Sequence, residues 1–526
     1  MRVLVADPIA HEGIDLLKHA GLDVDIVLGL KEPALLERIP AYDALIVRSE
    51  TRVTAAVIDA GRKLQVVGRA GVGVDNIDVQ AATRRGVLVV NAPTSNIIAA
   101  AEHSIALMLA LARHVPQANA SLKGGKWART QYVGAELQGK TLGIFGLGKV
   151  GTAVARRAKS FEMRIVAHDP FVSADFAKVL GVELVSKEHL LREADFISIH
   201  VPMTTGTANL ISRDDLKTVK PSVRIINAAR GGLVDEQALF DAVEAGKVAG
   251  AAVDTFTTEP AMDNPLFKSH KIIVTPHLGA STEEAQTKVA VEVAEQVISV
   301  LRGRPAQFAV NAPMVLPEAL AVLTPFVDVA QRLGKVAVQL AEGQMQSTVI
   351  RYTGEIARYD TKYLKASVIG GLLALISDER VNVVNADLIA EQRGMKIVEE
   401  KDAHDGGTYR NMLSVELVTS AGSTVVAGTV SLGQPHITQV DRYRVDVRMA
   451  EGWMLLIENQ DRPGMIGAVG TVCGKNDVNI SFMEVGRLER RGHAMMVLGV
   501  DEQVPDAALD AIRAIPGIIR VLQVRV

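Results

Sequence analysis

Three side chains suited to acid–base catalysis stand at the ends of predicted strands in the middle of the chain. Arg230 follows the aliphatic run VRIINAA, Glu259 lies in AAVDTFTTEP, and His277 ends IIVTPH. Histidine titrates near neutrality and suits the removal of a hydroxyl proton, a carboxylate beside it fixes its tautomer, and arginine clamps a substrate carboxylate. Each residue alone is also typical of a loop charge, a turn or a structural histidine. Together, in this order, they predict oxidation of a 2-hydroxy acid, with His277 as acid/base, Glu259 as its partner and Arg230 as the carboxylate clamp.

A glycine-rich turn upstream predicts the cofactor for this oxidation. Gly146, Gly148 and Gly151 form a G-x-G-x-x-G pattern between the strand-like TLGIF and the helix-like TAVARRAKSF. In that context the glycines permit a tight turn, a close approach of the backbone to a pyrophosphate, and close packing of helix on strand. Asp169 ends the next strand, where a carboxylate accepts hydrogen bonds from the ribose of NAD and repels the 2′-phosphate of NADP. An aspartate before Pro170 is also typical of a plain turn, but the combination predicts NAD.

Strand–helix alternation through the first 300 residues or so predicts two successive doubly wound parallel sheets, one flavodoxin-like and one Rossmann. A long Ala-rich helix at about 97–112 separates two series of short aliphatic strands, and the helical stretch after TPHLGA is interpreted as returning to the first unit. The prediction is therefore a discontinuous substrate-binding domain at 1–97 and 284–304 around an NAD-binding domain at 98–283. The proline-containing stretch 304–325 is interpreted as a linker.

The rest of the chain predicts two smaller domains. Residues 315–450 have a mixed α/β pattern, with a Gly/Asp/His-rich loop at 401–411. Residues 453–526 follow the order strand, helix, strand, strand, helix, strand, which is ferredoxin-like. Catalysis in a fold of two doubly wound units needs neither domain, so we expect them to stabilise, assemble or regulate.

Composition excludes several classes of protein. The formal net charge is −3 with basic and acidic residues nearly equal, which disfavours a nucleic-acid-binding protein or a polybasic membrane anchor. A single cysteine excludes an intramolecular disulfide and a cysteine-based zinc site, and no His/Asp/Glu cluster has the spacing of metal ligands. No secretory signal or membrane-spanning run is visible, so a soluble cytoplasmic protein without a metal is expected.

With these motifs in place, residues 1–305 resemble the D-isomer-specific 2-hydroxy acid dehydrogenase family. The motifs that carry the resemblance are VGRAGVGVDNID, GIFGLGKVG, INAARGGLVDEQAL, GAAVDTFTTEP and TPHLGAST, in this order. The resemblance implies that Arg230, Glu259 and His277 are the catalytic set and that Asp254 lies near the nicotinamide. It also implies that the backbone around Lys149 and Val150, at Ala228, and from His277 to Gly279 lines the cofactor.

Several arginines predict a doubly charged substrate, because a phosphate needs two or three charge-assisted donors. The resemblance to phosphoglycerate dehydrogenases, a branch of the same family, extends to the contexts LIVRS, VGRAG and GKW-x-R, and implies phosphate binding and the oxidation of D-3-phosphoglycerate in serine synthesis. Surface solubilisation is the alternative role for these arginines. The predicted substrate-binding residues are Arg48, Arg69, Val72, Gly73, Asn96 and Arg129.

The end of the chain resembles an ACT domain, a small amino-acid-sensing module. Asn459 and Asp461 stand in NQDRPG at a strand-to-helix turn, and Asn479 follows in VNI. Asp461 is expected to meet the ammonium group of an amino acid and the helix start its carboxylate, which suggests feedback inhibition by L-serine; a turn that only dimerises is the alternative. Residues 315–450 resemble the intervening domain of long phosphoglycerate dehydrogenases, where the Gly406-Gly407 loop either binds an anion or is a plain surface loop.

Two other functions remain open at this point. One is a related reductase acting on glyoxylate or hydroxypyruvate, which the extra C-terminal half disfavours, because such enzymes end near residue 330. The other is a dinucleotide-sensing co-repressor that retains the same His and Arg, which the ACT-like tail disfavours. A homo-oligomer, either a dimer or a tetramer, is expected, since the 97–112 helix and the ACT-like domain both offer surfaces for self-association.

Overall fold

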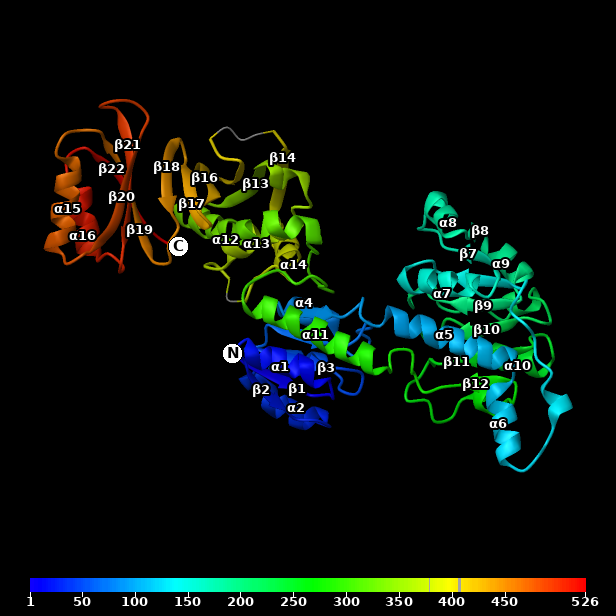
Figure 1. Ribbon diagram of the computed structural model, residues 1–526. Coiled ribbons are helices and arrows are strands. Elements are labelled where there is room, and N and C mark those ends of the chain that lie inside the picture. The colour runs from blue at the N-terminus through cyan, green and yellow to red at the C-terminus, as the bar shows by residue number, and fades with distance from the viewer. Residues whose placement is uncertain (378, 405–407) are drawn as a thin grey trace.

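The computed structural model describes residues 1–377, 379–404 and 408–526, and these form four β-sheets. Figure 1 shows the sheets as four bodies: the first beside the N-terminus, the second at the right, the third above the first, and the fourth at the far left. Helix α5 (Ile97–Ala112) leads from the first body into the second, and α11 (Glu283–Leu301) leads back to the first. The predicted fold class, two doubly wound units followed by a mixed α/β domain and a ferredoxin-like domain, is confirmed.

The first sheet is parallel and has the strand order β2-β1-β3-β4-β5. Its central strands are short aliphatic runs buried on both faces, as parallel strands between two helix layers must be. Helix α11 covers one face, where Val289 and Val293 share a core with Val3 and Val5. The remaining elements are β1 (Arg2–Val5), α1 (His11–His19), β2 (Asp23–Ile26), α2 (Glu32–Arg38), η1 (Ile39–Ala41), β3 (Ala44–Val47), α3 (Ala55–Ala60), β4 (Val66–Arg69), α4 (Val79–Arg84) and β5 (Leu88–Asn91).

The segment after α11 covers the edge of β5. Val310 N donates to Val89 O at 2.8 Å. Gln296 of α11 joins the strand to this segment, because its Nε2 donates to Asn91 O and its Oε1 accepts from Phe308 N, both at 2.7 Å. The edge that β5 would otherwise expose is thus paired before the chain enters its C-terminal half.

The second sheet is also parallel, with the order β12-β11-β10-β9-β6-β7-β8. The order reverses between β9 and β6, which is the point where doubly wound sheets bind dinucleotides. The short strand β8 was not predicted. The elements are α6 (Val115–Lys123), η2 (Arg129–Tyr132), β6 (Thr141–Phe145), α7 (Lys149–Lys159), β7 (Arg164–His168), α8 (Ala174–Leu180), β8 (Glu183–Leu184), α9 (Lys187–Glu193), β9 (Phe196–Ile199), η3 (Asp215–Lys217), β10 (Arg224–Asn227), α10 (Glu236–Glu244), β11 (Gly250–Val253), η4 (Pro265–Lys268) and β12 (Ile272–Val274).

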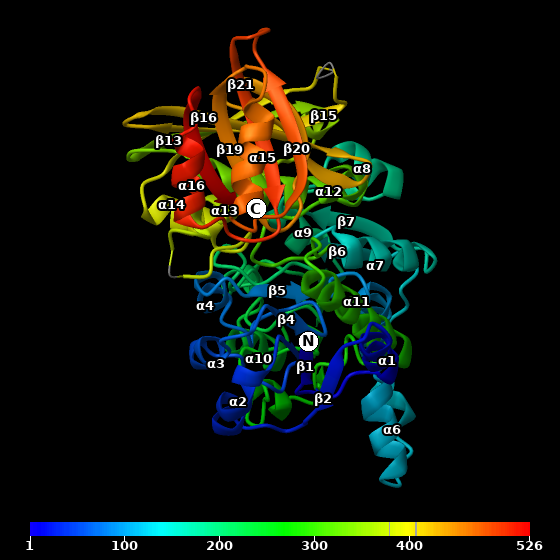
Figure 2. The same ribbon diagram turned by 90° about the vertical axis from the view of Figure 1, so that its left-hand side faces the viewer.

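Helix α5 is the most apolar long segment of this unit. Among the described residues no single helix has both the length and the apolar composition to cross a membrane, and only α5 and α6 taken together pass that test, with a bend of 61° between them. Half of the α5 residues, including Met108 and Leu111, are buried in the second unit. Beyond α5 the chain runs out along α6, which projects from the body in Figure 2.

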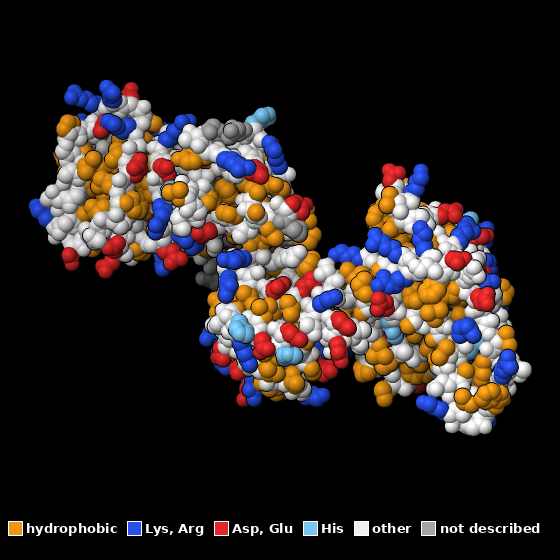
Figure 3. Space-filling view, in the orientation of Figure 1, with side chains coloured by type: hydrophobic (Ala, Val, Ile, Leu, Met, Phe, Trp, Pro, Cys, Tyr) orange, Lys and Arg blue, Asp and Glu red, His pale blue; other side chains and the backbone are white. Residues whose placement is uncertain are grey.

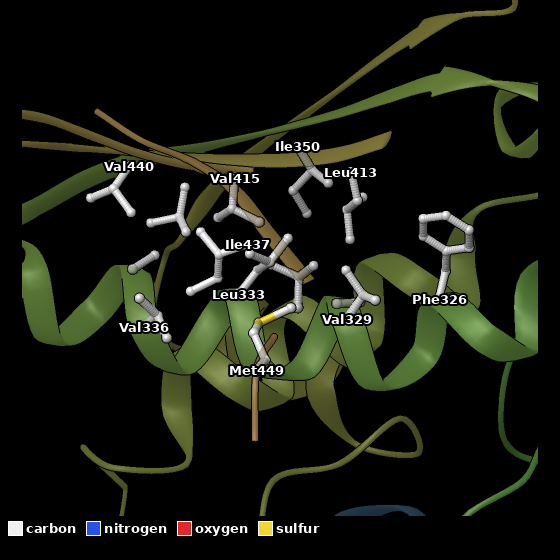
Figure 4. Packing of buried hydrophobic residues seen from close by; sticks show 14 of the residues in the cluster. Phe326, Val329, Leu333, Val336, Ile350, Leu413, Val415, Ile437, Val440 and Met449 are labelled. Atoms are coloured by element: carbon white, nitrogen blue, oxygen red, sulfur yellow. The ribbon is translucent and has the colours of Figure 1, made fainter. Parts of the chain in front are cut away.

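The interpretation of 304–325 as a linker is wrong in its second half. Helix α12 spans Pro317–Leu340 and contains Pro325. Proline is tolerated in the first turn of a helix, where Pro317 stands, because its missing N–H has no helical partner there. Pro325 lies inside the helix and is accommodated because the helix packs against the third sheet. Figure 4 shows Phe326, Val329, Leu333 and other apolar side chains of α12 facing the third sheet.

The third and fourth sheets share one hydrophobic core. Val329 and Leu333 of α12 lie in the same buried cluster as Leu456 and Val497 of the C-terminal domain, so the sheet face opposite α15 and α16 packs against the mixed domain. The third sheet has the order β14-β13-β15-β16-β17-β18 and the fourth β20-β21-β19-β22. Their elements are β13 (Met345–Gly354), η5 (Glu355–Arg358), α13 (Lys362–Leu373), α14 (Ala386–Gln392), β14 (Lys396–Asp402), β15 (Asn411–Thr419), β16 (Gly422–Ser431), β17 (Gln434–Val440), β18 (Tyr443–Arg448), β19 (Trp453–Gln460), α15 (Met465–Lys475), β20 (Ile480–Arg487), β21 (His493–Val500), α16 (Asp506–Arg513) and β22 (Ile518–Arg525).

Candidate active site

The glycine-rich turn joins β6 to α7 at the switch point of the second sheet. Gly146 has φ +87°, and a Cβ on Gly151 would lie 2.0 Å from Gly146 O, so neither position accepts a side chain without strain. A Cβ on Gly148, in contrast, would meet nothing within 4 Å, which leaves the mouth of the turn open. The amide groups of the first turn of α7, at Lys149 and Val150, have no helical acceptor and suit a pyrophosphate. The residues present therefore fit NAD at this turn.

Asp169 follows β7 and lies against the glycine-rich turn. Its Oδ2 accepts from Leu147 N at 2.8 Å, and its Oδ1 accepts from Phe171 N at 2.9 Å. The carboxylate is half-buried and directed at the turn, so its negative charge stands next to the place where the ribose of a dinucleotide follows the pyrophosphate.

A cleft of about 1280 Å³ opens between the two doubly wound units. Its walls combine residues from strand ends of both sheets, as parallel sheets require. The structure brings eight of the predicted residues together there: Arg48, Arg69, Val72, Gly73, Asn96, Arg230, Glu259 and His277.

Arg129 does not line this cleft. It belongs to η2, beyond the projecting helix α6, and is exposed. The bend between α5 and α6 carries the segment with Arg129 away from the cleft of its own chain. The position of Arg129 shortly after α5 in the sequence does not show in which direction the chain turns.

His277 and Glu259 form the acid–base pair of the cleft. His277 Nδ1 lies 2.8 Å from Glu259 Oε2, and Glu259 Oε1 accepts from Phe256 N at 3.0 Å. Burial of Glu259 opposes its ionised form, but the hydrogen bonds from His277 and from Phe256 N outweigh that effect, so the pKa of Glu259 lies below its ordinary value. Because Glu259 engages Nδ1, Nε2 is the ring nitrogen that is left to exchange a proton with a ligand.

His277 stands on a strained turn that Asp254 holds in place. Its φ is +54°, in the left-handed region that few non-glycine residues adopt. The fully buried Asp254 carboxylate accepts from Leu278 N at 2.8 Å and from Gly279 N at 2.9 Å, and Asp254 O accepts from His277 N at 2.9 Å. Asp254 and Gly279 were predicted to be cofactor-binding residues. In the structure their contacts with each other anchor the turn. Ala228 lies beside this turn, because its carbonyl oxygen would be 3.8 Å from a Cβ on Gly279.

Two polar residues around Asp254 were missed by the sequence analysis. Thr275 Oγ1 donates to Asp254 Oδ1 at 2.6 Å, and His103 Nε2 of α5 lies 3.2 Å from the same oxygen. The sequence signal for His103 was a histidine inside a largely apolar helix, and such a residue has no visible partner until the fold is known.

Arg48, Arg69 and Arg230 form a cluster of positive charge in the cleft. Burial, followed by the charges of Arg230 and Arg48, lowers the pKa of Arg69 to about 10. Arg69 Nη1 donates to Ala70 O at 3.3 Å, and its buried Nε has no hydrogen-bond partner among the described residues. Arg230 reaches the exposed Asp75 only at 3.9 Å. A half-buried cation with an unpaired buried Nε, and with two more cations beside it, is a site for an anion.

Two asparagines shape the wall of the cleft on the side of the first unit and were also missed. Asn76 Nδ2 donates to Arg48 O at 2.7 Å, and Asn91 Nδ2 donates to Val72 O at 2.6 Å. Val72 and Gly73 belong to the same turn, which lies close to Arg230, the predicted carboxylate clamp. A Cβ on Gly73 would be 2.7 Å from Arg230 Nη2. Asparagines are common in turns, so their role was not visible in the sequence.

The predicted effector residues lie in the C-terminal domain, away from the cleft; Asp461 and Asn479 have side-chain partners there, whereas the buried Asn459 Oδ1 has no hydrogen-bond partner among the described residues. Asp461 Oδ2 accepts from Arg491 N at 3.1 Å and pairs with Arg487 at 3.3 Å. Asn479 Nδ2 donates to Asp501 at 2.6 Å, and Asn459 is buried. Their joint role in binding an effector stays a prediction. The Gly406-Gly407 loop lies outside the described residues.

Three family models match successive parts of the chain. They are the NAD-binding domain of D-isomer specific 2-hydroxyacid dehydrogenases at 105–279, the D-3-phosphoglycerate dehydrogenase intervening domain at 322–441, and the ACT domain at 453–517.

Full-length relatives agree with these models. D-3-phosphoglycerate dehydrogenase of Synechocystis is 45% identical over 98% of this chain and 93% of its own length, and that of Archaeoglobus fulgidus is 42% identical over 99% of both. Among solved structures, TT0316 of Thermus thermophilus matches 59% of this chain and all of its own at 36% identity and a TM-score of 0.55. A D-lactate dehydrogenase of Aquifex aeolicus, solved with NAD and lactic acid, matches 58% of this chain and 96% of its own at 25% identity and a TM-score of 0.52. The chain therefore belongs to the D-3-phosphoglycerate dehydrogenase family of NAD-dependent oxidoreductases.

Proposed function

We propose that this protein oxidises D-3-phosphoglycerate to 3-phosphohydroxypyruvate with NAD, the first step of L-serine biosynthesis. The observation that carries this proposal is the cleft in which Arg69, half-buried with an unpaired Nε among the described residues, lies with Arg48 and Arg230 near the His277–Glu259 pair. The substrate bears a carboxylate, a hydroxyl and a phosphate, and the cleft offers a donor or base of matching type for each. The names of the full-length relatives support the same substrate.

In the proposed mechanism Arg230 binds the substrate carboxylate, while Arg48 and Arg69 bind the phosphate. His277 Nε2 accepts the proton of the C2 hydroxyl, and Glu259 stabilises the imidazolium that forms. When bound, NAD supplies the acceptor for the hydride that leaves C2. In the reverse direction His277 returns its proton to the carbonyl oxygen. The turn anchored on Asp254 holds the imidazole at a fixed place through these steps.

The test is NADH formation at 340 nm with D-3-phosphoglycerate at alkaline pH, compared with D-lactate and D-glycerate. Alkaline pH is needed because the oxidation releases a proton. Turnover of the phosphorylated acid alone would support the proposal. Turnover of only the unphosphorylated acids would remove the serine-pathway assignment and leave a general 2-hydroxy acid dehydrogenase.

The second half of the chain disfavours a glyoxylate reductase, and the cleft disfavours a co-repressor. The glyoxylate reductase that resembles this chain covers 59% of it, whereas the phosphoglycerate dehydrogenases cover nearly all of it. A co-repressor that only senses dinucleotides has no need for a buried anion site opposite an acid–base pair. If no hydroxy acid reduces NAD in the presence of the protein, that second function regains support.

Asp169 is expected to set the preference for NAD over NADP. Replacing it with asparagine removes a negative charge that would face the 2′-phosphate of NADP. Because like charges at a binding interface cost several kcal/mol, we expect the ratio of kcat/KM with NAD to kcat/KM with NADP to fall by at least about tenfold. The measurement is kcat/KM for both coenzymes. Asp175→Asn, an exposed position on α8, is the matched control and should leave the ratio unchanged. An unchanged ratio in Asp169→Asn would contradict the assignment.

We further propose that L-serine inhibits the enzyme through the ACT domain. Because Asp461 pairs with Arg487, a ligand ammonium has to replace that guanidinium, so Arg487→Ala should make inhibition more sensitive to serine. Initial rates with serine up to the millimolar range measure this. Asp477→Asn, exposed after α15, serves as the control. A flat serine curve for the wild type would end this proposal without touching the catalytic one.

A homo-oligomer, a dimer or tetramer, completes the proposal. The projecting segment around α6 exposes Trp127 (83%), Val133 (77%) and Leu122 (56%), more apolar surface than a free arm is expected to show. On the face shown in Figure 3, charged side chains of both signs are interspersed, without a large field of one sign that would oppose association. Sedimentation equilibrium tests the oligomer, and a monomer would contradict it.

A further inference from the structure

The buried carboxylate of Asp254 has more donors than a structural aspartate needs. Oδ1 accepts from Thr275 Oγ1 at 2.6 Å and from Leu278 N at 2.8 Å, and Oδ2 accepts from Gly279 N at 2.9 Å. His103 Nε2 approaches Oδ1 at 3.2 Å. His103 Nε2 also lies 3.4 Å from Thr275 Oγ1. A carboxylate only accepts hydrogen bonds, and the Thr275 hydroxyl already donates its proton to Asp254, so His103 Nε2 is the donor toward both oxygens. The result is a fully surrounded carboxylate directly behind the turn that bears His277.

His103 comes from a different part of the fold than the other three donors. Thr275, Leu278 and Gly279 belong to the end of β12 and its turn, whereas His103 lies on α5, the helix that leads from the first unit into the second. Its side chain is 19% exposed, and that of Asp254 is 0% exposed. An unpaired buried carboxylate costs several kcal/mol, and removing one partner of a buried pair is strongly destabilising. His103 therefore contributes what the turn alone does not: a donor held by a rigid helix.

We propose that His103 is a positioning residue for hydride transfer, which holds Asp254 as a carboxylate in one orientation and thereby fixes the turn that carries His277. Because His277 is the acid/base only under the proposed function, this inference rests on that function. A displacement of a reacting group by about 1 Å can cost about 100-fold in rate, so a small loosening of the turn has a large effect on kcat.

The charges around Asp254 determine its response to pH. Burial opposes the ionised form, and the hydrogen bond from His103, followed by those from Thr275 and Leu278, outweighs burial, so the pKa of Asp254 lies below its ordinary value. The titratable groups that face Asp254 are His103 from α5 and Glu259 and His277 from the loops after β11 and β12. Without the His103 donor, Asp254 takes up a proton at a higher pH than in the wild type. The turn then loses its acceptor on acidification.

The test compares His103→Leu with His103→Gln, in which the amide can still donate. For His103→Leu we expect kcat to fall by about 10- to 100-fold with KM and NADH affinity nearly unchanged, and the loss relative to wild type to deepen as the pH is lowered from neutrality. His103→Gln should recover most of the rate. Glu102→Gln changes the neighbour of His103 on α5 and removes only an ion pair with Arg157 of α7, so it is the matched control and should behave as the wild type.

Hydrogen–deuterium exchange of a peptide covering 276–282 supplies a readout without substrate. In His103→Leu the amides of Leu278 and Gly279 should exchange faster, and in His103→Gln they should stay protected. Wild-type kcat, pH dependence and exchange in His103→Leu would overturn the inference. Equal losses of kcat in His103→Leu and His103→Gln at an unchanged unfolding temperature would also overturn it, because the shape of the His103 side chain rather than its hydrogen-bond donation would then matter. If His103→Leu does not fold, His103→Met takes its place in both comparisons.

The exchange experiment also separates this inference from the proposed function. If no hydroxy acid reduces NAD, the proposed function fails, yet exchange at Leu278 and Gly279 still shows whether His103 holds the turn. If turnover is present and exchange is unaffected by His103→Leu, only the role of His103 is lost.

Discussion

Replacing His277 with alanine is expected to lower kcat for D-3-phosphoglycerate oxidation by roughly 10²- to 10⁴-fold, the usual contribution of a positioned general base. The imidazole lies at the end of β12 in the cleft, with Nδ1 bound to Glu259 and Nε2 left to the substrate. Coenzyme binding should persist, because the glycine-rich turn and Asp169 lie at other strand ends. NADH fluorescence titration and steady-state rates measure both quantities.

Two further variants make the result specific. Glu259→Gln keeps a hydrogen-bond acceptor for His277 Nδ1 but cannot stabilise an imidazolium, so its loss should be smaller than that of His277→Ala. His189→Ala changes an exposed histidine on α9 and should leave kcat unchanged. A kcat within a few-fold of wild type in His277→Ala would show that another group or a bound water serves as the base, and the acid–base assignment would fall.

The fold could be predicted from the sequence wherever one signal dominates. Buried parallel strands are short apolar runs between turns, and the Ala-rich α5 was predicted with the bounds 97–112 that the structure has. The prediction failed where local chemistry points away from the tertiary result. Pro317 and Pro325 are helix breakers by intrinsic preference, yet α12 forms because its apolar face is buried against the third sheet. Strand β8 has only two residues and pairs with β7 alone.

The same contrast, between features with a local sequence signal and features set by tertiary packing, applies to the candidate active site. Arg230, Glu259 and His277 were found because parallel strands end at the same edge of a sheet, which makes strand ends in sequence neighbours in space. His103 and Asn91 were missed because their partners, Asp254 and Val72, are set by helix packing and strand order rather than by spacing along the chain. Such supporting contacts have no local pattern.

Arg69 is expected to distinguish phosphorylated from unphosphorylated substrates. Arg69→Met removes charge-assisted hydrogen bonds to the phosphate, each worth about 1.5–3 kcal/mol, so KM for D-3-phosphoglycerate should rise by about 10- to 150-fold. Any turnover of D-glycerate should be unaffected, since that acid has no phosphate. Arg230→Gln should instead reduce kcat/KM for both acids, because both carry the carboxylate. Arg62→Gln, exposed after α3, is the control.

Stability provides the second half of the Arg69 prediction. The guanidinium is half-buried beside two other cations, and its Nε has no partner in the part of the chain that the structure describes, so we expect it to oppose folding in the free protein. An apolar side chain of similar length removes the cost of holding an incompletely hydrogen-bonded cation away from water. Arg69→Met should therefore unfold at the same or a higher temperature than the wild type while losing affinity for the phosphorylated acid. A residue kept for packing would show the opposite pairing, with reduced thermal stability and unchanged KM. Lower affinity for the phosphorylated acid together with equal or higher thermal stability would identify Arg69 as a residue that serves to bind an anion.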